Sequence, residues 1–153
     1  MSGGFRLGVV LRLREMAEDA ARAKLATAVD AHRVATQALV ALTDAEHAAE
    51  GRLVEMGASG AQAGDLRAAS AGVEAAELAT AQGRTRLMAA SEGLLVARGA
   101  LAEASKRRDV VERLRDRIRL LEAKEAQHRE DSQLSEIAGV RHARALGSRE
   151  VEP

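Results

Sequence analysis

The hydrophobic residues of the chain follow an alternating three-four spacing over two long stretches. Eight of ten positions at this spacing are apolar in the first stretch, and most of the twelve positions in the second are apolar too. An apolar repeat sustained over this length is typical of coiled-coil helices. The positions are Leu25, Ala28, His32, Ala35, Leu39, Leu42, Glu46, Ala49, Leu53 and Met56, and then Leu66, Ala69, Val73, Ala76, Thr80, Gly83, Leu87, Ala90, Leu94, Ala97, Leu101 and Ala104.

The two repeats are separated by the segment GASGAQAGD, residues 57–65, which contains three glycines. Glycine disfavours a helix interior, and Asp65 can cap the first free N–H groups of a following helix. The pattern predicts an all-α fold: one coiled-coil domain, residues 1–153, built as a long two-helix antiparallel hairpin with a C-terminal helical overhang. The predicted parts are helix one at about 5–56, the loop at 57–65, helix two at about 66–145, and a disordered tail at 146–153.

An antiparallel pairing in which facing residue numbers sum to about 122 places large side chains opposite small ones. Leu39 then faces Gly83, and Leu25 faces Ala97. Such alternation fills a narrow seam between two close helices. A slip of seven residues keeps much of the pattern, so the sequence defines the antiparallel sense more firmly than the register. In this register, helix two outruns helix one by about 28 residues, or ~42 Å.

Polar residues interrupt the seam at a few core positions, notably Glu18 and Glu46. A carboxylate at a core position is costly unless it is solvated or hydrogen-bonded. We expect each of these residues either to be solvated at the edge of the seam or to weaken the helix pairing locally.

Composition supports a narrow helical structure. The chain of 153 residues has 34 alanines and one Phe, with no Trp or Tyr, so it has little bulk for a broad core. Its net charge is zero, which gives no global attraction to nucleic acid or to an anionic membrane. Cysteine is absent, and no apolar run approaches the ~20 residues that span a bilayer. These features favour a soluble cytoplasmic protein.

Residue patterns for catalysis or for cofactor binding are weak. The glycine-containing loop lacks the Gly-Lys-Ser/Thr of a phosphate loop. Glu125 and His128 have the Glu-x-x-His spacing of dinuclear metal sites, but the motif occurs once and is interpreted as a solvated helix face. His32 has no second ligand in its expected layer. We therefore predict no catalytic, cofactor-binding or metal-binding residue, and no enzymatic activity.

A basic segment, RLRDRIRLL at residues 113–121, lies where the predicted hairpin ends. Nucleic-acid binding is disfavoured because single-strand recognition uses aromatic side chains, which the chain lacks. Binding to a lipid surface is disfavoured because only Leu114, Ile118 and Leu121 offer bulk on the apolar side. A solvated coiled-coil face is a further alternative. Arginine beside exposed Leu and Ile is typical of a protein-binding hot spot, which is the favoured interpretation.

Both ends of the chain resemble the family of the flagellar export protein FliJ. The N-terminal FRLGVVLRLRE is similar to that family's opening pattern at Phe5, Leu7, Val10, Leu11 and Arg14. The C-terminal segment is similar to the family's Arg-rich segment followed by Leu-Asp-Glu-Ile-Ala-x-x-Arg; Ser135 stands where Asp is usual, and His142 where an aromatic is usual. The matched C-terminal residues are Glu112, Leu114, Arg117, Leu134, Glu136, Ile137, Ala138 and Arg141.

The resemblance implies a component of flagellar type III protein export that resembles the central stalk of rotary ATPases. Its implied partners are the hexameric flagellar export ATPase, which it would stimulate, the membrane protein of the export gate, and export chaperones. It implies a protein at the cytoplasmic face of the inner membrane at the flagellar base, touching membrane only indirectly, monomeric alone and without a cofactor. The residues expected to bind the ATPase are Phe5, Leu7, Val10, Leu11, Arg113, Leu114, Arg117, Ile118 and Leu121. The alternatives are a generic coiled-coil scaffold and a binder of nucleic acid or membrane surfaces.

Overall fold

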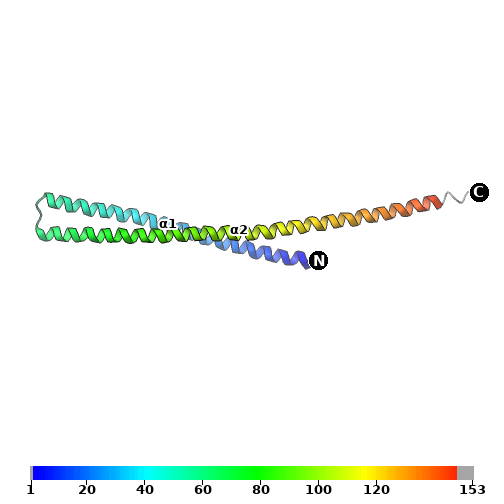
Figure 1. The fold of residues 1–153 in the computed structure, drawn as a ribbon, viewed down its shortest axis with the longest axis horizontal. Helices are drawn as coiled ribbons and strands as arrows, with labels where there is room; N and C mark the ends of the chain where they lie inside the picture. The colour runs from blue at the N-terminus through cyan, green and yellow to red at the C-terminus, as the bar shows by residue number, and fades with distance from the viewer. Residues whose placement is uncertain (1, 148–153) are drawn as a thin grey trace, which may run out of the picture. The chain divides into compact units, whose positions relative to one another are not determined.

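Two long helices make up nearly all of the computed structural model (Figure 1). The structure describes residues 2–147, and within them the side chains of residues 6–142 and 144. Helix α1 covers Ser2–Ala58 and helix α2 covers Ala63–Gly147, and no strand occurs in this described range. The predicted all-α two-helix hairpin is therefore confirmed.

The chain divides into two compact units, each containing parts of both helices. We call residues 13–106 the hairpin unit, and residues 2–12 together with residues 107–147 the terminal unit. Each unit is described by itself below.

Helices α1 and α2 run antiparallel within the hairpin unit. Contacts link Glu18 with Ser105, Leu39 with Gly83, and Glu46 with Glu77, so residue numbers rise along one helix as they fall along the other. Gly83 lies so close to α1 that a Cβ built on it would lie 3.3 Å from Leu39 Cδ1. A slip of one heptad would move Gly83 a full two turns from Leu39. The predicted antiparallel sense and the predicted Leu39/Gly83 layer are confirmed.

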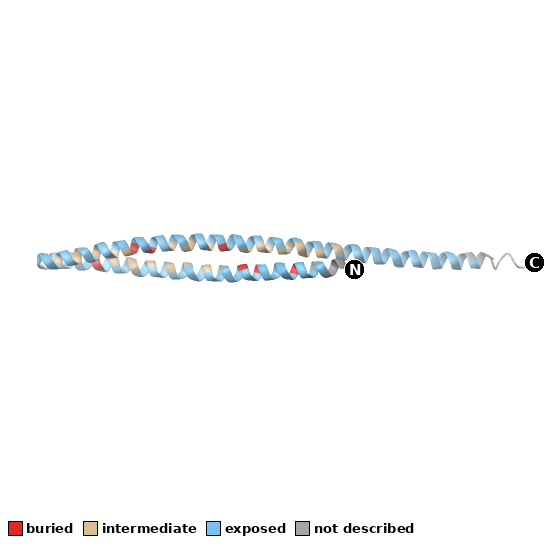
Figure 2. Cartoon of the chain, turned by 90° about the horizontal axis from the view of Figure 1, so that it is seen from below, coloured by how far each residue is buried: buried red, intermediate tan, exposed pale blue. Residues whose placement is uncertain are grey.

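The core of the hairpin unit is a single line of mostly small side chains. Its buried residues include Ala21, Ala49, Thr80, Gly83 and Ala97, whereas most leucines of the repeat are half-buried. Figure 2 shows the buried residues as isolated positions along helices whose other residues are half-buried or exposed. Each helix has only one neighbour, so every layer keeps one side open to water, and small residues are the ones that a two-helix seam can bury completely.

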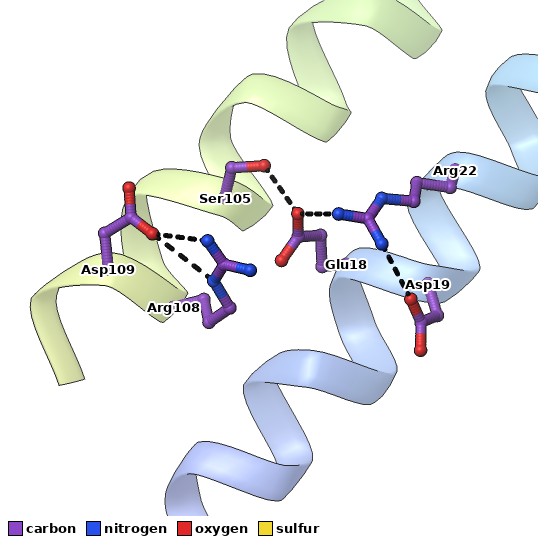
Figure 3. Close-up of polar contacts among 6 residues, drawn as sticks. All are labelled: Glu18, Asp19, Arg22, Ser105, Arg108 and Asp109. Atoms are coloured by element: carbon purple, nitrogen blue, oxygen red, sulfur yellow. Dashed lines mark hydrogen bonds and ion pairs between the residues drawn. The ribbon is translucent and has the colours of Figure 1, made fainter. Parts of the chain in front are cut away.

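Glu18 differs from the expectation that a polar seam residue is solvated or weakens the pairing. Its side chain is almost fully buried, and its Oε1 accepts hydrogen bonds from Arg22 Nη2 at 2.7 Å and from Ser105 Oγ at 3.0 Å (Figure 3). Charged hydrogen bonds offset the cost of burying the carboxylate. Glu18 is thus a bonded element of the seam. Glu46 fits the expectation better, because its Oε2 is buried without a partner among the described residues.

The turn between the helices is shorter than the predicted loop at 57–65. Gly60, with φ of 73°, ends α1 in a left-handed conformation. The Ala61 N–H donates to Met56 O at 3.1 Å, and the Gly60 N–H donates to Gly57 O at 3.4 Å. This pair of bonds is the Schellman arrangement, which satisfies the last carbonyls of a helix. Helix α2 then begins at Ala63, so Asp65 lies inside its first turn. There its negative charge interacts favourably with the positive end of the helix dipole.

Helix α2 continues to Gly147, two residues into the stretch predicted to be disordered. The rest of that predicted tail, residues 148–153, lies outside the described residues.

Candidate partner-binding surface of the terminal unit

The predicted ATPase-binding residues all belong to the terminal unit. They come from the start of α1 and from residues 113–121 of α2, two segments about a hundred positions apart in the sequence. The clustering of these segments into one compact unit means that both can contribute to one surface. The side chain of Phe5 lies outside the described residues.

The apolar members of the set differ in their exposure. Leu11 is only 7% exposed, and Leu7 and Ile118 are half-buried. Val10, Leu114 and Leu121 are exposed. Leu11 therefore holds the unit together and offers little surface, whereas the exposed members can contact another protein.

The arginines of the segment fall into two groups. The guanidinium of Arg115 lies 3.5 Å from Glu112 and 3.4 Å from Asp116, and the side chain is 29% exposed. Arg113, Arg117 and Arg119 are exposed and form no ion pair with any described residue, and Arg113 and Arg117 lie one helical turn apart. Glu112 and Asp116 therefore pair locally with Arg115. The unpaired guanidinium groups remain free to bind carboxylates in a bidentate way.

Arg108, a few residues earlier on α2, also has a local carboxylate. Its Nη2 donates to Asp109 Oδ1 at 2.8 Å (Figure 3). The basic character of the terminal unit is therefore reduced by pairing at Arg108 and Arg115, and it is concentrated at the unpaired arginines.

Several exposed apolar residues of the terminal unit were not assigned to the surface from the sequence: Val9, Leu120, Leu134, Ile137 and Val140. Every described side chain from residue 119 onward is exposed. Partly buried residues recur every three or four positions up to Ile118, and none follows among the described side chains. In the sequence, the spacing of apolar residues changes near Leu114, and this change could have indicated the exposed stretch. Val9 had no such signal, because it lies outside the repeat.

The structure offers little for metal or substrate chemistry. Glu125 and His128 are exposed, and His128 Nδ1 lies 3.2 Å from Ser132 Oγ one turn away. Within residues 6–142 and 144, the one group of side chains with ligand atoms close enough to hold an ion is Glu46, Glu50 and Glu77 in the hairpin unit. Exposed carboxylates often cluster without an ion, so no metal site is assigned. Neither helix, over its described length, has a stretch apolar enough to cross a bilayer.

The family model of the flagellar FliJ protein matches residues 2–147. The chain belongs to the FliJ family. Its resemblance at the two ends is thereby confirmed, and the match extends through the heptad repeats between them. No curated protein and no solved structure shows a significant match. Membership of the FliJ family identifies a component associated with flagellar export, in a family of non-catalytic export proteins.

Proposed function

We propose that this FliJ-family protein binds the hexameric flagellar export ATPase as a subunit resembling a central stalk, and that it stimulates ATP hydrolysis. The observation that supports this most directly is the composition of the terminal unit. It brings residues from both ends of the chain together, and it exposes Val10, Leu114 and Leu121 as well as the unpaired Arg113 and Arg117.

Exposed aliphatic side chains next to unpaired arginines suit a partner that presents apolar pockets rimmed with carboxylates. Arginine is enriched among interface residues that dominate binding energy, because its planar fork binds carboxylates in a fixed geometry. Arg115 is already paired within its own helix and contributes less. The proposed contact residues are therefore Val10, Arg113, Leu114, Arg117, Ile118 and Leu121, with Leu7 and Leu11 shaping the unit and Phe5 kept as a contact expected from the sequence.

A stalk acts on a ring without carrying out chemistry of its own. It changes the ring's conformational equilibrium only if it contacts the subunits unequally, since a ligand with equal affinity for two states shifts nothing. A surface made of two different helix segments meets this condition, because it has no internal symmetry to match a six-fold ring. Stimulation of ATP hydrolysis would follow from this unequal contact.

The same proposal includes a link from the ATPase to the export gate and to export chaperones at the cytoplasmic face of the inner membrane. In this arrangement the protein is peripheral and contacts the membrane only through these partners. Family membership supports this export role.

The binding test compares three purified chains with the purified export ATPase of the same organism. The wild-type chain and a control variant, Arg52→Ala/Val54→Ala/Arg67→Ala, are expected to bind with equal affinity. The variant Arg113→Ala/Arg117→Ala/Ile118→Ala is expected to bind at least about tenfold more weakly, because two charged contacts and one apolar contact are lost. The control residues are also exposed and lie near the turn between the helices. Equal binding by all three chains would refute the assigned surface.

A further inference from the structure

The hairpin unit carries a second stripe of residues on α2, separate from the seam with α1, in which charged and apolar side chains alternate. Its members, called here the α2 outer stripe, are exposed and lie on one face of the helix at successive spacings of four, three, four, four, three and four residues. That order is the same in both directions from its central member, Met88. The stripe consists of Glu77, Ala81, Arg84, Met88, Glu92, Leu95 and Gly99.

A shallow groove follows the middle of this stripe. It has a volume of about 490 Å³ and is lined by Arg84, Met88, Glu92 and Leu95 of the stripe, together with Leu39, Leu87 and Ser91. Met88 is 61% exposed and Leu95 is 66% exposed. Two large apolar side chains one heptad apart beside a groove form a surface that another helix can cover.

We propose that the chain, which the family resemblance implies to be monomeric alone, instead forms a dimer. In this dimer the α2 outer stripe binds the same stripe of a second copy, antiparallel, about a two-fold axis that passes through Met88. A two-fold interface requires one surface to be complementary to itself. Each residue of the stripe must therefore fit the residue equally far from Met88 on its other side, which belongs to the other copy. Under this reversal, Arg84 of one copy faces Glu92 of the other, and Ala81 faces Leu95.

The charges of the stripe are complementary under this reversal. Arg84 and Glu92 form no ion pair with any residue for which side chains are described. In the dimer each of them would face one opposite charge on the other copy, so the Arg84/Glu92 pair would occur twice. Cross-interface charge complementarity of this kind selects a partner and its orientation.

The sizes are complementary as well. Leu95 would pack on Ala81 at both ends of the contact, and the two Met88 side chains would meet on the axis. The alternation of large and small residues repeats the rule that packs α1 on α2, where Leu39 faces Gly83. Methionine suits a position on the axis because its unbranched side chain adapts to an identical neighbour.

The ends of the stripe provide an independent argument. At one end, carboxylate oxygens of Glu46, Glu50 and Glu77 lie within 4.8 Å of one another, which leaves three like charges together. At the other end lie Gly99 and its neighbour Arg98, which is exposed and forms no ion pair with a described residue. The reversal brings Gly99 and Arg98 of one copy to the acidic group of the other, where the basic side chain would reduce the repulsion.

Disulfide trapping tests the predicted axis. The chain has no cysteine, so a single introduced thiol reports one position. Met88→Cys is expected to give a symmetric disulfide-linked dimer under mild oxidation, at least about tenfold faster than Ala89→Cys, because a thiol on the axis meets its own copy. Ala89 is the matched control: it is also exposed, but it points about 100° away around the helix. Equal rates for the two variants would overturn the proposal.

Charge reversal tests the predicted contacts in the full-length chain. Sedimentation equilibrium at concentrations up to about 500 µM is suitable, because a contact limited to one helix face gives a weak dimer. Arg84→Glu and Glu92→Arg are each expected to weaken dimerisation by about tenfold, and the double variant is expected to return to within about threefold of the wild type. A wild-type chain that stays monomeric over this range, or a double variant weaker than both single variants, would contradict the pairing.

The self-association uses the hairpin unit, so its test is separate from that of the proposed function. The variant Arg113→Ala/Arg117→Ala/Ile118→Ala is expected to dimerise like the wild type even though its ATPase binding is lost. If this variant also fails to dimerise while keeping its helical circular dichroism, the contact lies in the terminal unit and the assignment to the α2 outer stripe is wrong.

Discussion

Gly83 of α2 lies directly against Leu39 of α1: a Cβ placed on Gly83 would lie 3.9 Å from Leu39 Cα. The same Cβ would lie 2.8 Å from Leu42 Cδ1, closer than side-chain carbons normally approach. This contact fixes the register of the hairpin unit, because it places Gly83 opposite Leu39 and Leu42, and a side chain at position 83 would require Leu42 to shift.

The close approach predicts different effects of alanine at two glycines of α2. Gly93→Ala has nothing within 4 Å of its new Cβ, so the gain in helix propensity should raise the free energy of unfolding by about 0.5 to 1 kcal/mol. Gly83→Ala should be less stabilising than Gly93→Ala by at least about 1 kcal/mol, since Leu42 must move. Urea unfolding followed by circular dichroism measures both. An equal gain at both positions would show that the helices are farther apart.

Thr80 is 1% exposed, and its Oγ1 has no hydrogen-bond partner among the described residues. Thr80→Val keeps the shape of the side chain and removes an unsatisfied polar group, so it should raise the free energy of unfolding by about 1 to 2 kcal/mol. The control Thr85→Val is exposed and loses a bond to Ala81 O at 3.2 Å, so it should change stability by less than about 0.5 kcal/mol. Destabilisation by Thr80→Val would indicate a bonded hydroxyl.

Ser105 is the donor from α2 to the buried carboxylate of Glu18. Ser105→Ala should lower the free energy of unfolding by about 1 to 2 kcal/mol, because a buried charged acceptor loses a partner. Asp19, whose side chain is 72% exposed, pairs with Arg22 at 3.3 Å. Asp19→Ala should cost less than about 0.5 kcal/mol, as exposed ion pairs contribute little. Equal losses in chemical denaturation would mean that Glu18 is solvated.

The register also predicts which cysteine pairs form disulfides. Two heptads from the observed Leu39/Gly83 layer, this register places Leu25 opposite Ala97. If the helices were shifted by one heptad, His32 would lie opposite Ala97 instead. Leu25→Cys/Ala97→Cys should therefore oxidise readily within one chain, and His32→Cys/Ala97→Cys should not. Electrophoretic mobility without reductant separates the linked chain from the open one. Preferential linkage of the second pair would place the helices one heptad away.

The fold could be predicted from the sequence because large side chains face small ones along most of the seam between the helices. Large-to-small alternation identified the Leu39/Gly83 layer, since a leucine fills the space that a facing glycine leaves open. The turn was predicted less well, because three glycines were present and only Gly60 adopts positive φ. Sequence alone did not indicate which of them would end α1.

The candidate surface was predicted as segments but not as individual side chains. Sequence pattern placed Leu11 and Leu114 in the same class, yet one is buried and the other exposed. Arg113 and Arg115 also looked alike, and only Arg115 has carboxylates within reach. These differences depend on the direction of each side chain around the helix. The α2 outer stripe was missed because the heptad pattern assigns one apolar stripe to each helix.

The most direct test of the central claim is the ATP turnover of the purified export ATPase, measured as the chain is added. The wild-type chain and the control Arg52→Ala/Val54→Ala/Arg67→Ala should raise turnover to the same level, because both keep the exposed surface of the terminal unit. Arg113→Ala/Arg117→Ala/Ile118→Ala should leave turnover at the rate of the ATPase alone while keeping full helical circular dichroism. Undiminished stimulation by this variant would contradict the account.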